Sequence, residues 1–96
     1  MEDSYYVTPL HAAAGNGNLE MVKYLAELIE GNNNPSGYKG FTPLHVAASR
    51  GHLNVVKYYT KQLQNPNPKG DEATPLHVAA QMGHLAIVKH LCNMLE

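Results

Sequence analysis

Histidine and cysteine are the residues of this sequence best suited to catalysis or metal binding. The chain has six histidines and one cysteine. Two pairs, His45 with His52 and His77 with His84, share a seven-residue spacing. Two zinc ligands on one helical face need a spacing of about four residues, and a glycine that is expected to end a helix lies inside each pair. Because no third and fourth ligand can be named, we expect no metal and no cofactor.

Cys92 is the one candidate for a nucleophilic cysteine, and a single cysteine cannot form an internal disulfide. Only His90 lies near it in the sequence, and no orienting group or oxyanion-binding element can be named. Cys92 falls on an apolar stripe, so we expect it to fill the core. The glycines follow helices or lie in connectors, which excludes a phosphate-binding loop between a strand and a helix. The sequence therefore predicts a protein that is not an enzyme.

Composition limits the partners that this chain can have. It has 96 residues, of which 44% are hydrophobic and 16% charged, as in a folded protein rather than a disordered one. The net charge of −1, without a basic stretch, excludes nucleic acid as an expected partner. No apolar stretch approaches the roughly 18 residues that a membrane span needs. The acidic start at Met1–Ser4 is unlike a signal peptide, so we expect the chain to be cytoplasmic or to be expressed inside a recombinant cell. We also expect it to be a monomer.

An internal repeat organises the sequence. The tetrapeptide Thr-Pro-Leu-His begins at Thr8, Thr42 and Thr74, and the two intervals are 34 and 32 residues. The similarity continues through an Ala-Ala pair, a Gly, a Leu and a Val-Lys pair. Segments 42–57 and 74–89 are identical at 12 of 16 positions. No single unit can bury its apolar face alone, so the three units must stack on one another.

Each unit is expected to hold a short helix followed by a longer one. The threonine suits an N-cap, the proline suits the first helical position, and the glycine nine residues after the threonine suits a helix end. The second helices should begin near Leu19, Leu53 and Leu85 and bury one apolar stripe each. The residues of this structural motif are Thr8, Pro9, His11, Gly17, Thr42, Pro43, His45, Gly51, Thr74, Pro75, His77 and Gly83.

Polar residues outside the motif are expected to be structural or solvated. Lys23, Lys57 and Lys89 recur in register, which favours a solvated outer face. His52 and His84, just after the helix-ending glycines, are expected to stabilise turns. The segments 30–40 and 64–72 are rich in Asn, Pro and Gly and are expected to connect the units.

These segments resemble the ankyrin repeat family, whose units carry a Thr-Pro-Leu-His-x-Ala-Ala-x-x-Gly-His-Leu-x-x-Val-Lys run. The sequences TPLHVAASRGHLNVVK and TPLHVAAQMGHLAIVK match nearly throughout, while the first unit has Asn18 in place of the second histidine. The resemblance implies an all-α solenoid of helix-turn-helix units joined by β-turn finger loops. It implies one domain over 1–96, with units at about 5–38, about 39–70 and about 71–96, the last without a finger.

The resemblance also implies roles for particular residues. His11, His45 and His77 would hydrogen-bond the Thr hydroxyl and nearby backbone, tying successive units together. The second connector is two residues shorter than the first and has Glu72 where a glycine is usual, so its finger should be distorted. The last helix carries the apolar residues Cys92 and Met94, and the terminal faces of such an array have no neighbouring unit. We therefore expect the C-terminal face to be the less protected one.

The function that the resemblance implies is binding of a protein or peptide on the concave face of the array. An alternative is an engineered, reconstructed or excised scaffold with no partner of its own, although the irregular connectors argue against a strict consensus design. For binding, the concave surface carried over from the family comprises Tyr5, Val7, Asn16, Tyr38, Lys39, Phe41, Ser49, Arg50, Asp71, Ala73, Gln81 and Met82. Phe41 could equally cover the base of a finger.

Overall fold

The computed structural model describes residues 8–28, 42–62 and 74–95. This part of the chain forms six α-helices and no strand, which confirms the all-α class. Their bounds are α1 Pro9–Gly15, α2 Leu19–Leu28, α3 Pro43–Arg50, α4 Leu53–Gln62, α5 Pro75–Gln81 and α6 Leu85–Leu95. The second helices start at the leucines that the sequence predicts. The connectors and their expected fingers lie outside the described residues.

The first helix of each unit begins at a threonine cap. Thr8, Thr42 and Thr74 have extended backbone, and each side chain accepts a hydrogen bond from the backbone N–H three residues later. A proline then occupies the first helical turn, where its missing N–H leaves no bond unmade. At α3 the cap is reciprocal, because Nδ1 of His45 accepts from the Thr42 backbone N–H at 3.1 Å.

A glycine with positive φ turns the chain after each first helix. The φ angles are 73° at Gly17, 85° at Gly51 and 81° at Gly83. The residue after each glycine donates its N–H back into the helix, as His52 does to the Ala47 carbonyl at 3.0 Å. Left-handed backbone is favourable for glycine alone among common residues. This turn joins each first helix to α2, α4 or α6, which packs on it.

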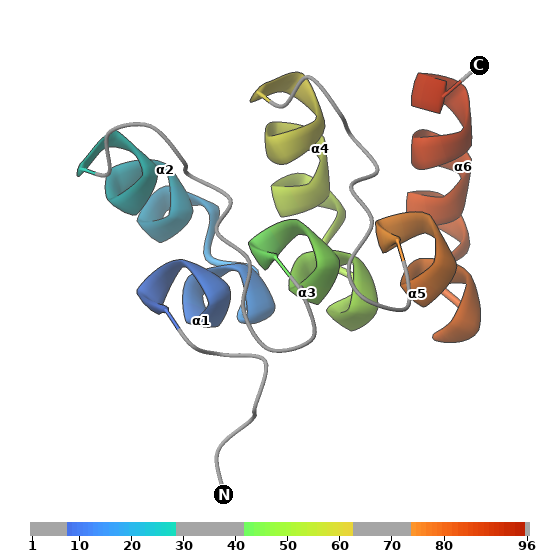
Figure 1. Ribbon diagram of the computed structural model, residues 1–96, viewed down its shortest axis with the longest axis horizontal. Coiled ribbons are helices and arrows are strands. Elements are labelled where there is room, and N and C mark those ends of the chain that lie inside the picture. The colour runs from blue at the N-terminus through green and yellow to red at the C-terminus, as the bar shows by residue number, and fades with distance from the viewer. Residues whose placement is uncertain (1–7, 29–41, 63–73, 96) are drawn as a thin grey trace, which may run out of the picture.

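The six helices form two rows (Figure 1). The first helices make one row, in which α1 packs on α3 and α3 on α5. The second helices make the other row, in which α2 packs on α4 and α4 on α6, and each also packs on the first helix of its own unit. The largest contacts between units therefore join equivalent helices.

The core lies between the rows. Leu10, Leu44 and Val22 are fully buried, and Tyr59 and Leu91 fill it from the second helices. The small alanines that follow each motif histidine let the first helices approach closely; Ala13, Ala14, Ala47, Ala48 and Ala79 are buried in this way. Packing of small residues in one row and larger ones in the other thus spaces the units.

The open face of the third unit differs from the sequence expectation. Cys92 is exposed, so the prediction that it fills the core is wrong. Leu85 is 63% exposed and does not belong to the buried stripe, which Ile87 completes instead. Ala26 and Thr60, the equivalents of Cys92, are buried because α4 packs on α2 and α6 on α4. No described helix covers α6 on its far side.

Candidate functional site

The described part of the predicted binding surface lies at the C-terminal ends of the first helices. Asn16, Arg50 and Met82 occupy one register, immediately before the positive-φ glycine of each unit. Ser49 and Gln81 occupy the position before it. We call these five residues the first-helix row, because α1, α3 and α5 pack side by side and bring the three ends into line.

The first-helix row is exposed while the helices that carry it are anchored. Asn16, Arg50 and Gln81 are exposed, Met82 is 57% exposed and Ser49 is half-buried. On the same helices, Leu10, Leu44 and Val78 are buried in or at the core. Side chains of the row can therefore change without opening the core, which is a property of a recognition surface on a rigid scaffold.

Seven residues of the predicted surface are outside the described residues. They are Tyr5, Val7, Tyr38, Lys39, Phe41, Asp71 and Ala73. The structure therefore brings together the five helix-end members of the set, and the remaining members stay a prediction.

Two histidines hold the helix ends in place by bonds between units. Nε2 of His52 donates to the Gly15 carbonyl at 2.8 Å, and Nε2 of His84 donates to the Ser49 carbonyl at 2.9 Å. A carbonyl only accepts, so both rings carry a proton on Nε2. Each bond satisfies a carbonyl at the end of a first helix, which has no partner within the helix. These two residues therefore position the first-helix row, a role larger than turn stabilisation.

Each of these rings also lies against a glycine of the preceding unit. A Cβ added to Gly17 would lie 2.5 Å from Nδ1 of His52, and one added to Gly51 would lie 2.7 Å from Cε1 of His84. Around Gly83 no atom of the described residues lies within 4 Å of such a Cβ. Glycine is therefore required twice over at Gly17 and Gly51, for its φ angle and for the ring beside it.

The motif histidines differ along the array. His11 and His45 are fully buried, with Nδ1 at 2.7 Å from the Thr8 hydroxyl and at 2.9 Å from the Thr42 hydroxyl. His77 is exposed. The difference arises because a following unit packs on α1 and α3, whereas no described helix packs on the far side of α5.

The described residues contain no group of three or more His, Cys, Asp or Glu side chains that could hold a metal ion. Cys92 is a free, exposed thiol. Within the same residues, every helix is too short or too polar to traverse a bilayer.

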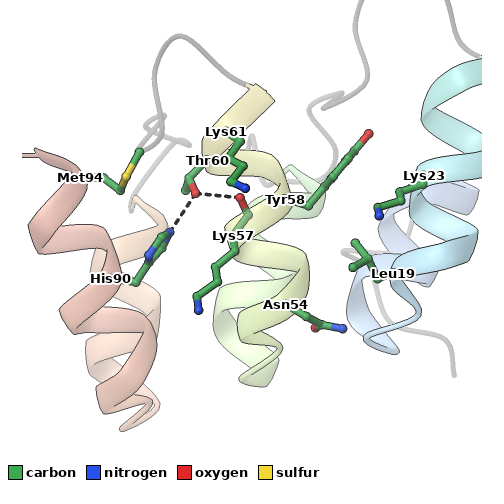
Figure 2. A pocket seen from close by; sticks show the side chains of 9 residues that line it. All are labelled: Leu19, Lys23, Asn54, Lys57, Tyr58, Thr60, Lys61, His90 and Met94. Atoms are coloured by element: carbon green, nitrogen blue, oxygen red, sulfur yellow. Dashed lines mark hydrogen bonds between the residues drawn. The ribbon is translucent and has the colours of Figure 1, made fainter.

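A second feature of the surface was not foreseen from the sequence. A pocket of about 670 Å³ lies along the second helices, with Lys23 from α2, Lys57 and Lys61 from α4, and His90 and Met94 from α6 in its walls (Figure 2). We call it the outer pocket. From their recurring positions alone, Lys23, Lys57 and Lys89 are predicted to lie on a solvated face. The signal in the sequence that could have found this pocket is the pair of departures from the repeat at Thr60 and His90.

Tyr59, a buried residue of α4, has a strongly shifted pKa. Tyr59 is fully buried, and its hydroxyl has no hydrogen-bond partner in the part of the chain that the structure describes. Burial, and then the neighbouring Tyr58, raise the pKa of Tyr59 far above its usual range. The Tyr58 and Tyr59 rings meet edge to face, with centroids 5.4 Å apart. Tyr59 is therefore a neutral packing group.

The fold and this surface define a class: a solenoid of stacked two-helix units whose aligned helix ends are exposed. A family model described as ankyrin repeats in three copies matches residues 1–61, and a model for the ankyrin repeat matches residues 71–94. The chain belongs to the ankyrin repeat family. No curated protein sequence gives a significant match to it. Ankyrin repeats are generally modules for protein–protein interaction and are typically not enzymes.

Proposed function

We propose that this chain binds a protein or peptide through the first-helix row, together with the predicted surface residues outside the described ranges. The observation that supports it most is the alignment of Asn16, Arg50 and Met82. Three units present a variable, exposed side chain at one register of an otherwise repeated motif. Arg and Met are enriched in protein interfaces. Because the scaffold is preorganised, little conformational entropy is lost on binding.

The size and charge of this surface define the kind of partner. Three helix ends offer less area than the roughly 1,600 Å² of a standard interface, so the partner must also contact the connectors or bind with modest affinity. The row contains one charged residue, Arg50. The affinity should therefore depend only weakly on salt.

A capture experiment tests the proposal. The immobilised chain is exposed to a cell extract, beside the variant Arg50→Ala/Met82→Ala and the control Lys89→Ala/Asn93→Ala, whose residues are exposed on α6. We expect bands that the wild type and the control retain and that the row variant loses. Bands lost from the control and kept by the row variant would contradict the proposal. A wild type that retains no band would favour a scaffold without a partner of its own.

A further inference from the structure

The outer pocket has the size and lining of a ligand site. Its volume of about 670 Å³ falls within the roughly 300–1,000 Å³ of small-molecule sites. Leu19, Tyr58 and Met94 supply apolar surface, and they come from α2, α4 and α6 respectively. Figure 2 shows Lys23 and Tyr58 between α2 and α4, and His90 and Met94 facing α4 from the other side. The pocket therefore spans all three units on the second-helix side of the array.

The charge of the pocket is of one sign. Lys23, Lys57 and Lys61 line it, and among the residues that the structure describes no acidic side chain does. None of the three forms an ion pair with any residue that the structure describes, although Glu20 and Glu27 lie on α2 together with Lys23. The whole chain has a net charge of −1, so this local excess does not follow from the overall composition. Like charges repel one another, and an anion bound beside these lysines would reduce that repulsion.

Several pocket residues are not dictated by the repeat. Thr60 occupies the position of Ala26 and Cys92, and His90 occupies the position of Tyr24 and Tyr58. Thr60 is 3% exposed and donates its hydroxyl to the Lys57 carbonyl at 3.1 Å. Its oxygen therefore accepts from Nε2 of His90 at 2.9 Å. This bond ties α6 to α4 and fixes one wall of the pocket.

The same bond leaves Nδ1 of His90 as the site that takes up a proton. Burial, and then the charge of Lys57, lower the pKa of His90 below its usual value. Lys57 on α4 is the charged group that acts on the ring. Lys61 on α4 lines the same pocket, and Lys23 lies on α2, on the other side of α4 from His90. An anion beside Lys57 would offset part of this positive field and raise the pKa again.

We propose that the outer pocket binds a ligand that carries phosphate groups. Lysine ammonium groups bind phosphate as mobile point charges, and three of them from two helices suit more than one phosphate. The apolar side chains would contact the carbon skeleton of the ligand. A soluble polyphosphate compound and the headgroup of a phosphoinositide share this chemistry, and the experiment below distinguishes these two sources.

Calorimetric titration of the full chain with inorganic tripolyphosphate is the first test. Removal of two lysine charges in Lys57→Gln/Lys61→Gln should weaken binding at least about tenfold. Lys89→Gln is the matched control, since Lys89 has the same register as Lys57 but does not line the pocket; its affinity should change less than about twofold. Absence of binding at millimolar tripolyphosphate would overturn the proposal, as would an equal loss in both variants.

Two further measurements complete the test. The imidazole signals of His90, followed by NMR, should give a higher pKa with tripolyphosphate than without it, and an unchanged pKa would overturn the proposal. Cosedimentation with phosphatidylcholine vesicles, with and without phosphatidylinositol bisphosphate, identifies a lipid source when only the phosphoinositide vesicles retain the protein. Tripolyphosphate binding without such retention supports a soluble phosphate compound. Arg50→Ala/Met82→Ala should bind tripolyphosphate normally, so this proposal and the proposed function can fail separately.

Discussion

Replacement of the helix-ending glycines tests how the units are joined. Gly51 and Gly83 have φ angles of 85° and 81°, so alanine at either position carries the same backbone strain of about 1–2 kcal/mol. The two sites differ in their surroundings. A Cβ at Gly51 would lie 2.7 Å from the ring of His84, whereas a Cβ at Gly83 would have no atom within 4 Å in the part of the chain that the structure describes. Gly83→Ala is therefore a matched control for Gly51→Ala.

The extra cost at Gly51 follows from the displacement of the ring. His84 donates to the Ser49 carbonyl at 2.9 Å, and a neutral hydrogen bond of this kind contributes about 1 kcal/mol. We expect Gly51→Ala to lower the free energy of unfolding by about 2–3 kcal/mol, and Gly83→Ala by about 1–2 kcal/mol.

Urea unfolding followed by circular dichroism measures both values, and a double-mutant cycle with His84→Ala isolates the ring. In the His84→Ala background the cost of Gly51→Ala should fall by about 1 kcal/mol, to the backbone strain alone. The cycle is needed because Gly83 lies in the third unit, on whose far side no described helix packs, and local opening there can reduce the cost of any substitution. An unchanged cost of Gly51→Ala without the imidazole would refute the reasoning.

Four other outcomes are expected. Tyr59→Phe should raise the free energy of unfolding by up to about 1 kcal/mol in urea titrations, because the removed hydroxyl is buried without a described partner; a loss of stability would show that the hydroxyl is bonded. Burial, and then Lys57, lower the pKa of His90 in the folded chain, so the unfolded chain binds the proton more readily. The contribution of His90 to the free energy of unfolding is therefore complete above about pH 6.5 and is lost as the pH falls through the folded pKa. Urea midpoints of wild type should therefore drop more than those of His90→Gln between about pH 7.5 and about pH 5. Exposed Cys92 should react with a thiol reagent as fast in the native as in the unfolded chain, and Cys92→Ser should change stability by less than about 0.5 kcal/mol. Amide exchange should find α6 opening before α4, since α4 is covered on both sides by α2 and α6; full protection of α6 would contradict this.

The sequence could predict whatever depends on neighbours along the chain. The caps at Thr8, Thr42 and Thr74 and the turns at the glycines need only a few consecutive residues, so their pattern is visible in one unit. Exposure depends instead on the next unit. His45 and His77 stand in the same motif, yet the first is buried by the unit that follows and the second is exposed. Equal sequence therefore did not mean equal burial, and the prediction for Cys92 failed for this reason.

The repeat pattern did not predict the outer pocket, but two residues that depart from this pattern, Thr60 and His90, line it. A position that recurs in every unit, such as the motif threonine, is explained by the scaffold alone. Thr60 is different: it places a hydroxyl at a buried position where Ala26 stands in the first unit, and burying a hydroxyl costs free energy unless it is bonded. The hydroxyl bonds to the Lys57 carbonyl of its own helix, and a second bond comes from His90, which itself replaces a tyrosine and lies 30 residues further along the chain. These two departures from the repeat bond to one another and so tie α6 to α4. The same two residues line the pocket that Lys23, Lys57 and Lys61 also line, so a search for such paired departures would have pointed to this part of the surface.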